Sequence, residues 1–199
     1  SKQGAEIIFF PENVLFMRVK EGSEVPFFQE DDPYLSQIKK MAQDYKILIH
    51  LGSVPFRIHN KHYNSSLAFN SHGEMTVLYS KVHLFDIQLS GQAPIRESDV
   101  FDRGEKATCF TYKSWSFAQS ICYDIRFSEL YRKYAEKEVD VILIPAAFLK
   151  ATGEAHWHIL NRARAIESQC YVVSSAQGGV HKSTLYPCLL YTSDAADEE

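Results

Sequence analysis

The sequence lacks the features that mark most secreted, membrane and nucleic-acid-binding proteins. Its four cysteines, Cys109, Cys122, Cys170 and Cys188, form neither a C-x-x-C pair nor a zinc-type cluster. No apolar run approaches the roughly 18 residues of a membrane span, and no signal peptide opens the chain. The net charge of -4 offers no basic footprint for nucleic acid. We therefore expect a reduced, cytoplasmic protein that uses no metal or cofactor and binds neither membrane nor nucleic acid.

Length and composition are those of an ordinary globular domain. The 199 residues are 45% hydrophobic and 23% charged, which is enough apolar material for one core of useful size. The eight histidines are scattered along the chain. His156 and His158 stand two positions apart and would not share a helix face, which disfavours a metal site there.

Short apolar runs alternate with amphipathic stretches along the chain. Strands are expected over residues 5–10, 46–51, 63–70, 75–80, 108–112, 115–121, 139–144 and 170–175. Helices are expected over residues 33–45, 126–137 and 154–169. Asp32 and Pro33 are typical of a helix start, and Ile159, Ala163 and Ile166 fall on one face of the last helix. Because strands and helices alternate and two strand pairs read as hairpins, the sequence predicts an α/β fold with a mixed sheet arrangement.

The most informative stretch surrounds Cys122. A strand-like run ends at Ile121 and a helical pattern begins near Arg126, so the chain must turn sharply at the cysteine. A thiol at such a corner stands clear of the sheet, and the backbone N–H groups after it are free to face a bound oxygen. Hydrolases place a nucleophilic serine at an elbow of this kind. Free cysteine is also among the most buried residue types, so a purely structural thiol remains the alternative.

Three further polar residues stand where strands meet loops. Glu12 follows the first strand, Lys81 closes the strand over residues 75–80, and Glu97 lies in the long aperiodic segment up to Gly104. Each alone fits a solvated strand end. Together with a thiol they form a chemical set: one carboxylate accepts the thiol proton, the lysine stabilises a developing oxyanion, and the second carboxylate orients its neighbours.

Five segments resemble successive signature blocks of the nitrilase superfamily of carbon–nitrogen hydrolases, over about residues 4–186. They are FFPE, YSKVHLFD, PIRES, ICYDIRFSEL and TGEAHWHILNRARAIESQCYVV. The resemblance implies that Glu12 is the general base, Lys81 the cation of the oxyanion site, Cys122 the nucleophile and Glu97 the fourth catalytic residue. The N–H of Tyr123 would complete the oxyanion hole. It also implies an αββα sandwich, a homodimer and a small-molecule amide substrate.

Smaller details favour an amidase branch of that superfamily. Tyr123-Asp124 follows the cysteine, where true nitrilases typically carry Trp-Glu. GQAPIRES and RARAIESQCYVVSSAQGG are similar to the deaminated glutathione amidase branch, with ω-amidases, which cleave 2-oxoglutaramate, as the alternative. Such carboxylate-bearing substrates require a cation, for which Arg126 or Lys150 are candidates. A structural ion pair between Arg126 and Glu167 is the competing interpretation, and burial favours it.

Both ends of the sequence depart from the family pattern. Members of the family begin with a further strand and helix, and they continue through further strands after the AQGG segment. We therefore expect residues 1–187 to be a partial carbon–nitrogen hydrolase domain. Residues 188–199 match a translated sequencing adapter and are interpreted as a non-native tail. Two readings of other classes remain: a catalytically inactive binding module on the same fold, and a papain-like hydrolase that uses His156.

Overall fold

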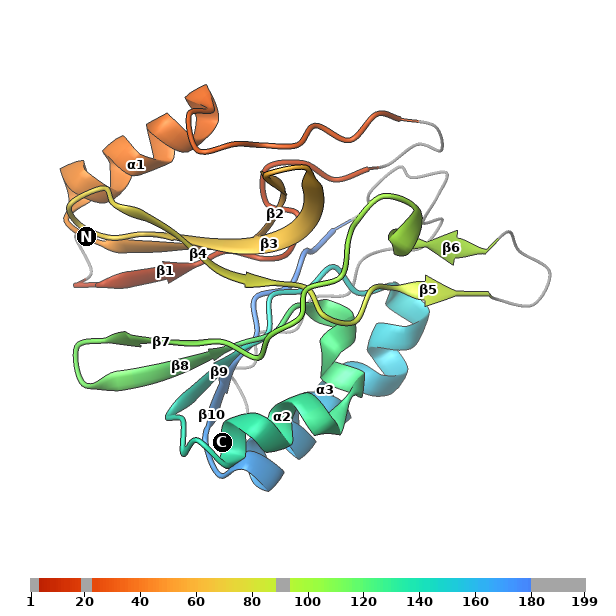
Figure 1. The fold of residues 1–199 in the computed structure, drawn as a ribbon. Helices are drawn as coiled ribbons and strands as arrows, with labels where there is room; N and C mark the ends of the chain where they lie inside the picture. The colour runs from red at the N-terminus through yellow and green to blue at the C-terminus, as the bar shows by residue number, and fades with distance from the viewer. Residues whose placement is uncertain (1–3, 19–22, 89–93, 180–199) are drawn as a thin grey trace.

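Two four-stranded sheets stack face to face between layers of helix (Figure 1). Helix α1 (Pro33–Tyr45) covers the outer face of one sheet, and α2 (Ser128–Ala135) and α3 (Lys150–Ser168) cover the other. The layering is the αββα arrangement that the family resemblance implies. The computed structural model describes residues 4–18, 23–88 and 94–179. The sequence interpreted as a non-native tail lies outside these residues.

The first sheet has the order β1-β2-β3-β4. Its strands are β1 (Ile7–Phe9), β2 (Leu48–Ile58), β3 (Lys61–Phe69) and β4 (Met75–Ser80). β1 runs parallel to β2, and the other pairs are antiparallel. The β3–β4 hairpin and α1 are confirmed, and the Oδ1 atom of Asp32 accepts the N–H of Tyr34 at 2.8 Å. β2 continues seven residues past the predicted end at Leu51.

The second sheet has the order β10-β9-β8-β7. Its strands are β7 (Cys109–Tyr112), β8 (Trp115–Gln119), β9 (Val141–Leu143) and β10 (Tyr171–Val173). β7 and β8 form the predicted hairpin, whereas β8, β9 and β10 are parallel. The segment predicted to lack periodicity contains a small ribbon of β5 (Asp86–Ile87) and β6 (Ile95–Arg96), followed by the 3-10 turn η1 (Glu97–Asp99).

Three apolar layers hold these elements together. One lies beneath α1, one between the sheets, and one beneath α2 and α3. The layer between the sheets is built from Phe117, Val141 and Leu143 with Ile7 and Phe9 packed against them. Each sheet is covered by helix on its outer face and by the other sheet on its inner face. Loops from both sheets meet at the strand ends on one side of the sandwich (Figure 1).

The face of α3 that carries Ile159 and Ile166 points to solvent. Ile159 and Ile166 are 70% and 73% exposed. The buried face carries Trp157 together with polar residues, among them Asn161 and Arg164. Arg164 reaches the carbonyl of Ile125 at 2.9 Å, so its burial is supported by a specific hydrogen bond. The dimer implied by the family resemblance stays a prediction.

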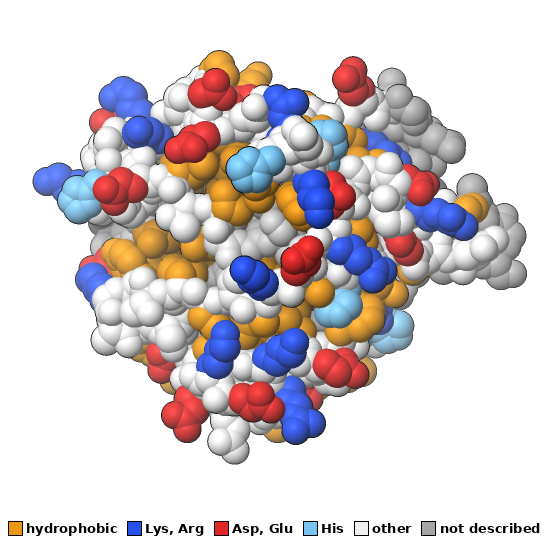
Figure 2. Space-filling view, in the orientation of Figure 1, with side chains coloured by type: hydrophobic (Ala, Val, Ile, Leu, Met, Phe, Trp, Pro, Cys, Tyr) orange, Lys and Arg blue, Asp and Glu red, His pale blue; other side chains and the backbone are white. Residues whose placement is uncertain are grey.

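Charged side chains are interspersed on the face drawn in Figure 2, where basic and acidic groups alternate with apolar patches. Within the described ranges, no helix combines the length and the apolar content that crossing a membrane requires.

Candidate active site

The chain turns at Cys122 as the sequence predicts. Cys122 has φ of +47°, a left-handed conformation that is uncommon for a residue with a side chain. It begins the 3-10 turn η2 (Cys122–Arg126), and α2 starts only at Ser128, two residues later than predicted. Its own N–H donates to the carbonyl of Pro145 at 2.8 Å. Among the described residues the N–H of Tyr123 has no acceptor, so it is available to a bound oxygen.

A buried carboxylate fixes this turn. Asp124, fully buried, accepts the N–H of Ile121 at 2.9 Å and the hydroxyl of Tyr79 at 2.8 Å through Oδ2. Its Oδ1 atom accepts the N–H of His83 at 2.9 Å and lies 2.7 Å from Nδ1 of that ring. Asp124 thereby ties the thiol's turn to the end of β4. The sequence reading used Asp124 only as a branch marker and missed this role.

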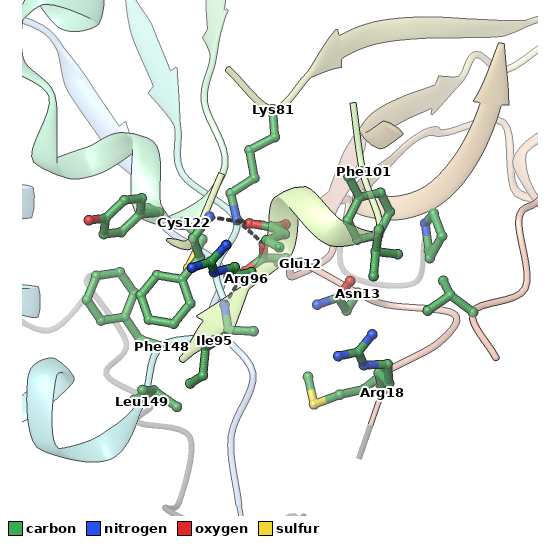
Figure 3. A pocket seen from close by; sticks show the side chains of 18 of the residues that line it. Glu12, Asn13, Arg18, Lys81, Ile95, Arg96, Phe101, Cys122, Phe148 and Leu149 are labelled. Carbon is green, nitrogen blue, oxygen red and sulfur yellow. Dashed lines mark hydrogen bonds and ion pairs between the residues drawn. The ribbon is translucent and has the colours of Figure 1, made fainter. Parts of the chain in front are cut away.

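The three residues predicted around the thiol contact one another, and Figure 3 shows Glu12 and Lys81 beside Cys122. The Nζ atom of Lys81, a residue only 2% exposed, lies 2.9 Å from Oε1 of Glu12 and 2.9 Å from Oε2 of Glu97. Glu12 follows β1, Lys81 follows β4 and Glu97 opens η1. The other oxygen of Glu12 accepts the N–H of Ala147 at 2.8 Å. All four predicted residues line the same cavity, whose volume is about 100 Å³.

Two glycines allow the backbone to bring these residues so close. A Cβ on Gly52 would lie 2.1 Å from the carbonyl oxygen of Phe10, where the chain passes from β1 to Glu12. A Cβ on Gly104 would lie 1.9 Å from the carbonyl oxygen of Ser80, next to Lys81. No side chain fits at either distance, so the close approach depends on glycine at both positions.

Charge and burial set the protonation of the group. Burial disfavours the Lys81 ammonium, but the carboxylates of Glu12 and Glu97 outweigh it and raise the pKa of Lys81 well above its usual value. Burial raises the pKa of the Cys122 thiol, the charge of Glu12 raises it further, and Lys81 offsets only part of the rise. The resting site therefore holds a neutral thiol beside an ammonium, and attack by sulfur requires a base.

Asn64, on β3, is a site residue that the sequence reading missed. Its Nδ2 atom donates to Oε1 of Glu12 and to Oε1 of Glu97, both at 3.0 Å. In the sequence, the only indication of this role is a polar amide within a largely buried strand, where polar side chains need hydrogen-bond partners.

The two candidate cations differ in their position relative to the cavity. Arg126 lines the cavity, and its guanidinium lies 5.3 Å from the ring centre of Phe148. The competing interpretation, an ion pair with Glu167, is wrong because Glu167 pairs with Arg164. Lys150 is exposed and lies 3.5 Å from Glu154, and it does not line the cavity.

Other wall residues complete the cavity. Arg18 and Arg96 also line it, along with the aromatic rings of Phe101 and Phe148 (Figure 3). The sequence reading did not single out either arginine, although Arg96 directly precedes Glu97. His156, the partner that a papain-like site would need, is not among the lining residues.

Comparisons with known proteins show the family of the chain. The family model described as carbon–nitrogen hydrolase matches residues 1–190. A deaminated glutathione amidase from Yersinia enterocolitica is 36% identical over 91% of this chain and 65% of its own length. The omega-amidase NIT2 of Bos taurus is 33% identical over 92% of this chain and 67% of its own. The chain thus spans about two thirds of the length of these curated relatives.

Solved structures give the same fold. The NitFhit protein of C. elegans superposes with a TM-score of 0.80 at 31% identity, covering 90% of this chain and 45% of that one. Nit3 of Saccharomyces cerevisiae, a member of branch 10 of the nitrilase superfamily, gives a TM-score of 0.75 at 28% identity, covering 96% and 68%. Fold, matched length and identity lead to one conclusion: this chain belongs to the carbon–nitrogen hydrolase family of the nitrilase superfamily.

Proposed function

We propose that the chain forms the catalytic part of an amidase that cleaves a small, linear, carboxylate-bearing amide through an acyl-enzyme on Cys122. The observation that carries the proposal is the convergence of Glu12, Lys81 and Glu97 in the cavity that contains the Cys122 turn. The position and environment of each group match one step of amide hydrolysis.

The first half-reaction uses the base and the oxyanion site. Glu12 takes the proton of the Cys122 thiol as sulfur attacks the amide carbon, which is necessary because the pKa of the thiol is raised. Lys81 has three N–H donors, of which two face carboxylates, so the third can stabilise the oxyanion together with the N–H of Tyr123. When the C–N bond breaks, Glu12 returns the proton to the leaving amine.

The second half-reaction repeats these roles with water. Glu12 takes a proton from a water molecule while the oxygen of that water attacks the thioester carbon. The new oxyanion binds the same two donors, the C–S bond breaks, and the proton returns to sulfur. The products are a carboxylic acid and the free thiol, and Glu97 acts throughout by holding Lys81 in place.

The cavity wall supports an anionic substrate. Arg126 stands in the wall with its guanidinium over aromatic rings. Its Nη1 atom lies 3.3 Å from Nδ1 of His156, and it forms no ion pair with a carboxylate of the described residues. We propose that it binds the substrate carboxylate. Deaminated glutathione is the substrate proposed first, because relatives of that name are the more similar; 2-oxoglutaramate is the alternative.

The test is made on the natural protein that carries this chain. Cys122→Ala should abolish amide hydrolysis, and intact mass spectrometry should show an acyl adduct in the unmodified protein only. Glu12→Gln and Lys81→Met should each lower the rate by orders of magnitude while the circular dichroism spectrum is unchanged. Turnover by the Cys122→Ala variant would end the assignment of the nucleophile.

Substrate choice is tested with the same preparation. Deaminated glutathione should be cleaved faster than 2-oxoglutaramate, and simple nitriles should not react. Faster hydrolysis of a nitrile than of any amide would overturn the amidase proposal. Binding of amides without turnover or adduct would instead identify a binding module.

A further inference from the structure

Asn64 forms hydrogen bonds with three of the four predicted site residues. Its side chain donates from Nδ2 to Glu12 and Glu97 at 3.0 Å each, and its backbone carbonyl accepts the N–H of Lys81 at 2.9 Å. It is 1% exposed and does not line the cavity. Asn64 therefore acts on these residues without access to a substrate.

The amide orientation follows from its neighbours. Ionised carboxylates only accept hydrogen bonds, so the nitrogen of Asn64 must face Glu12 and Glu97. The Oδ1 atom then points elsewhere and has no partner among the described residues, although it is buried. If Asn64 served only to fill space, a leucine would do so without leaving a buried acceptor unpaired. What the amide adds over an apolar side chain is its two N–H donors.

These donors answer a charge problem. Two carboxylates face the single ammonium of Lys81, and the Cys122 thiol beside them must lose its proton during the reaction. Neighbouring carboxylates repel each other, so they need donors that hold them together. Asn64 donates one N–H to each carboxylate and adds no charge of its own, so it holds both of them in place around Lys81.

We propose that Asn64 is a positioning residue that aligns Glu12 and Glu97 around Lys81, so that Glu12 can accept the thiol proton. This inference rests on the proposed function, since it gives Glu12 the part of the base. Without the amide donors Glu12 is no longer held in line with the thiol, so kcat falls while substrate binding is largely kept.

The experiment compares Asn64→Leu and Asn64→Asp with a matched control on the same strand. Ser66→Ala removes a fully buried hydroxyl that donates to the carbonyl of Gly52 at 2.6 Å and contacts none of the site carboxylates. In Asn64→Leu, kcat should fall by about tenfold with little change in KM, because the base is misplaced while the cavity wall is unchanged. Asn64→Asp keeps the size but removes both N–H donors and adds a third carboxylate, so its kcat should fall further.

The control separates positioning from structure. Ser66→Ala should lower the melting temperature and leave kcat and KM at the values of the unmodified protein. An unchanged kcat in both Asn64→Leu and Asn64→Asp would overturn the inference, whatever their melting temperatures.

A second readout needs no amide substrate. The rate of alkylation of Cys122 by iodoacetamide, followed by mass spectrometry, depends on the base but not on hydrolysis. If the unmodified protein cleaves no amide and Asn64→Leu still slows alkylation relative to Ser66→Ala, the positioning role stands and the proposed function fails. If neither Asn64 variant slows alkylation, the role of Asn64 fails by itself.

Discussion

Folding stability should depend on His50 in the mildly acidic range. This side chain lies between the two sheets, 1% exposed, with Nε2 2.9 Å from Oε1 of Gln119. The rings of Phe9 and Phe110 lie beside it, with centroids 5.6 Å and 6.4 Å away. Burial, only partly offset by the Gln119 hydrogen bond, lowers the pKa of His50 from 6.5 to about 4. The folded protein therefore holds the imidazole neutral.

The sign of the effect follows from the lowered pKa. Between pH 6.5 and about 4 the unfolded chain binds a proton at His50 that the folded chain does not, so the free energy of unfolding falls as the pH falls. One pKa unit corresponds to about 1.4 kcal/mol, which gives a full loss of about 3 kcal/mol. Of this, about 2 kcal/mol is lost between pH 7.5 and pH 5. That is a large share of a typical stability of about 5–15 kcal/mol.

Urea unfolding at pH 7.5 and pH 5 measures this loss. The unmodified chain should lose about 2 kcal/mol more than His50→Gln between the two pH values. His72→Gln, on an exposed loop, should behave as the unmodified chain does. A paired variant, His50→Leu with Gln119→Leu, leaves neither partner unsatisfied and should show the same flattened dependence. The reasoning is refuted if the His50 variants lose as much stability on acidification as the unmodified chain.

Two further substitutions test the geometry of the site. Gly52→Ala should lower the free energy of unfolding in urea by about 1–3 kcal/mol, because its Cβ would lie 2.1 Å from the Phe10 carbonyl oxygen. Unaltered stability would contradict that close approach. Arg126→Ala should raise KM for a carboxylate-bearing amide by about tenfold or more with little change in kcat, as expected for loss of a charged hydrogen bond. Lys150→Ala is its exposed control and should leave KM unchanged; equal KM values in both variants would exclude Arg126 as the carboxylate ligand.

Elements with local signals could be predicted from the sequence. Helix α1 has the predicted bounds because two adjacent residues determine its start. Asp32 caps the helix with its side chain, and Pro33 occupies the first helical position. The two hairpins and the turn at Cys122 are local in the same sense. Glu12, Lys81 and Glu97 were also identified, but through the family resemblance, since each alone is an ordinary charged residue at a strand end.

Features that depend on distant partners could not be predicted. Gly52 and Pro55 are typical of a strand end, but β2 continues through both. The strand continues because β3 pairs with it and the segment after β1 packs directly against Gly52. The polar buried face of α3 is supported by groups elsewhere in the chain, such as the Ile125 carbonyl that receives Arg164. The contacts of Asn64 and Asp124 likewise depend on the folded structure, because each residue joins segments that are far apart in the sequence.

The reacting groups are divided between the two halves of the sandwich. Glu12 and Lys81 follow strands of the first sheet, whereas Cys122 follows a strand of the second. Glu12 and Lys81 precede Cys122 in the chain, so both leave the ribosome before the cysteine does. The three residues meet only where the two sheets dock, and neither sheet alone carries the whole set.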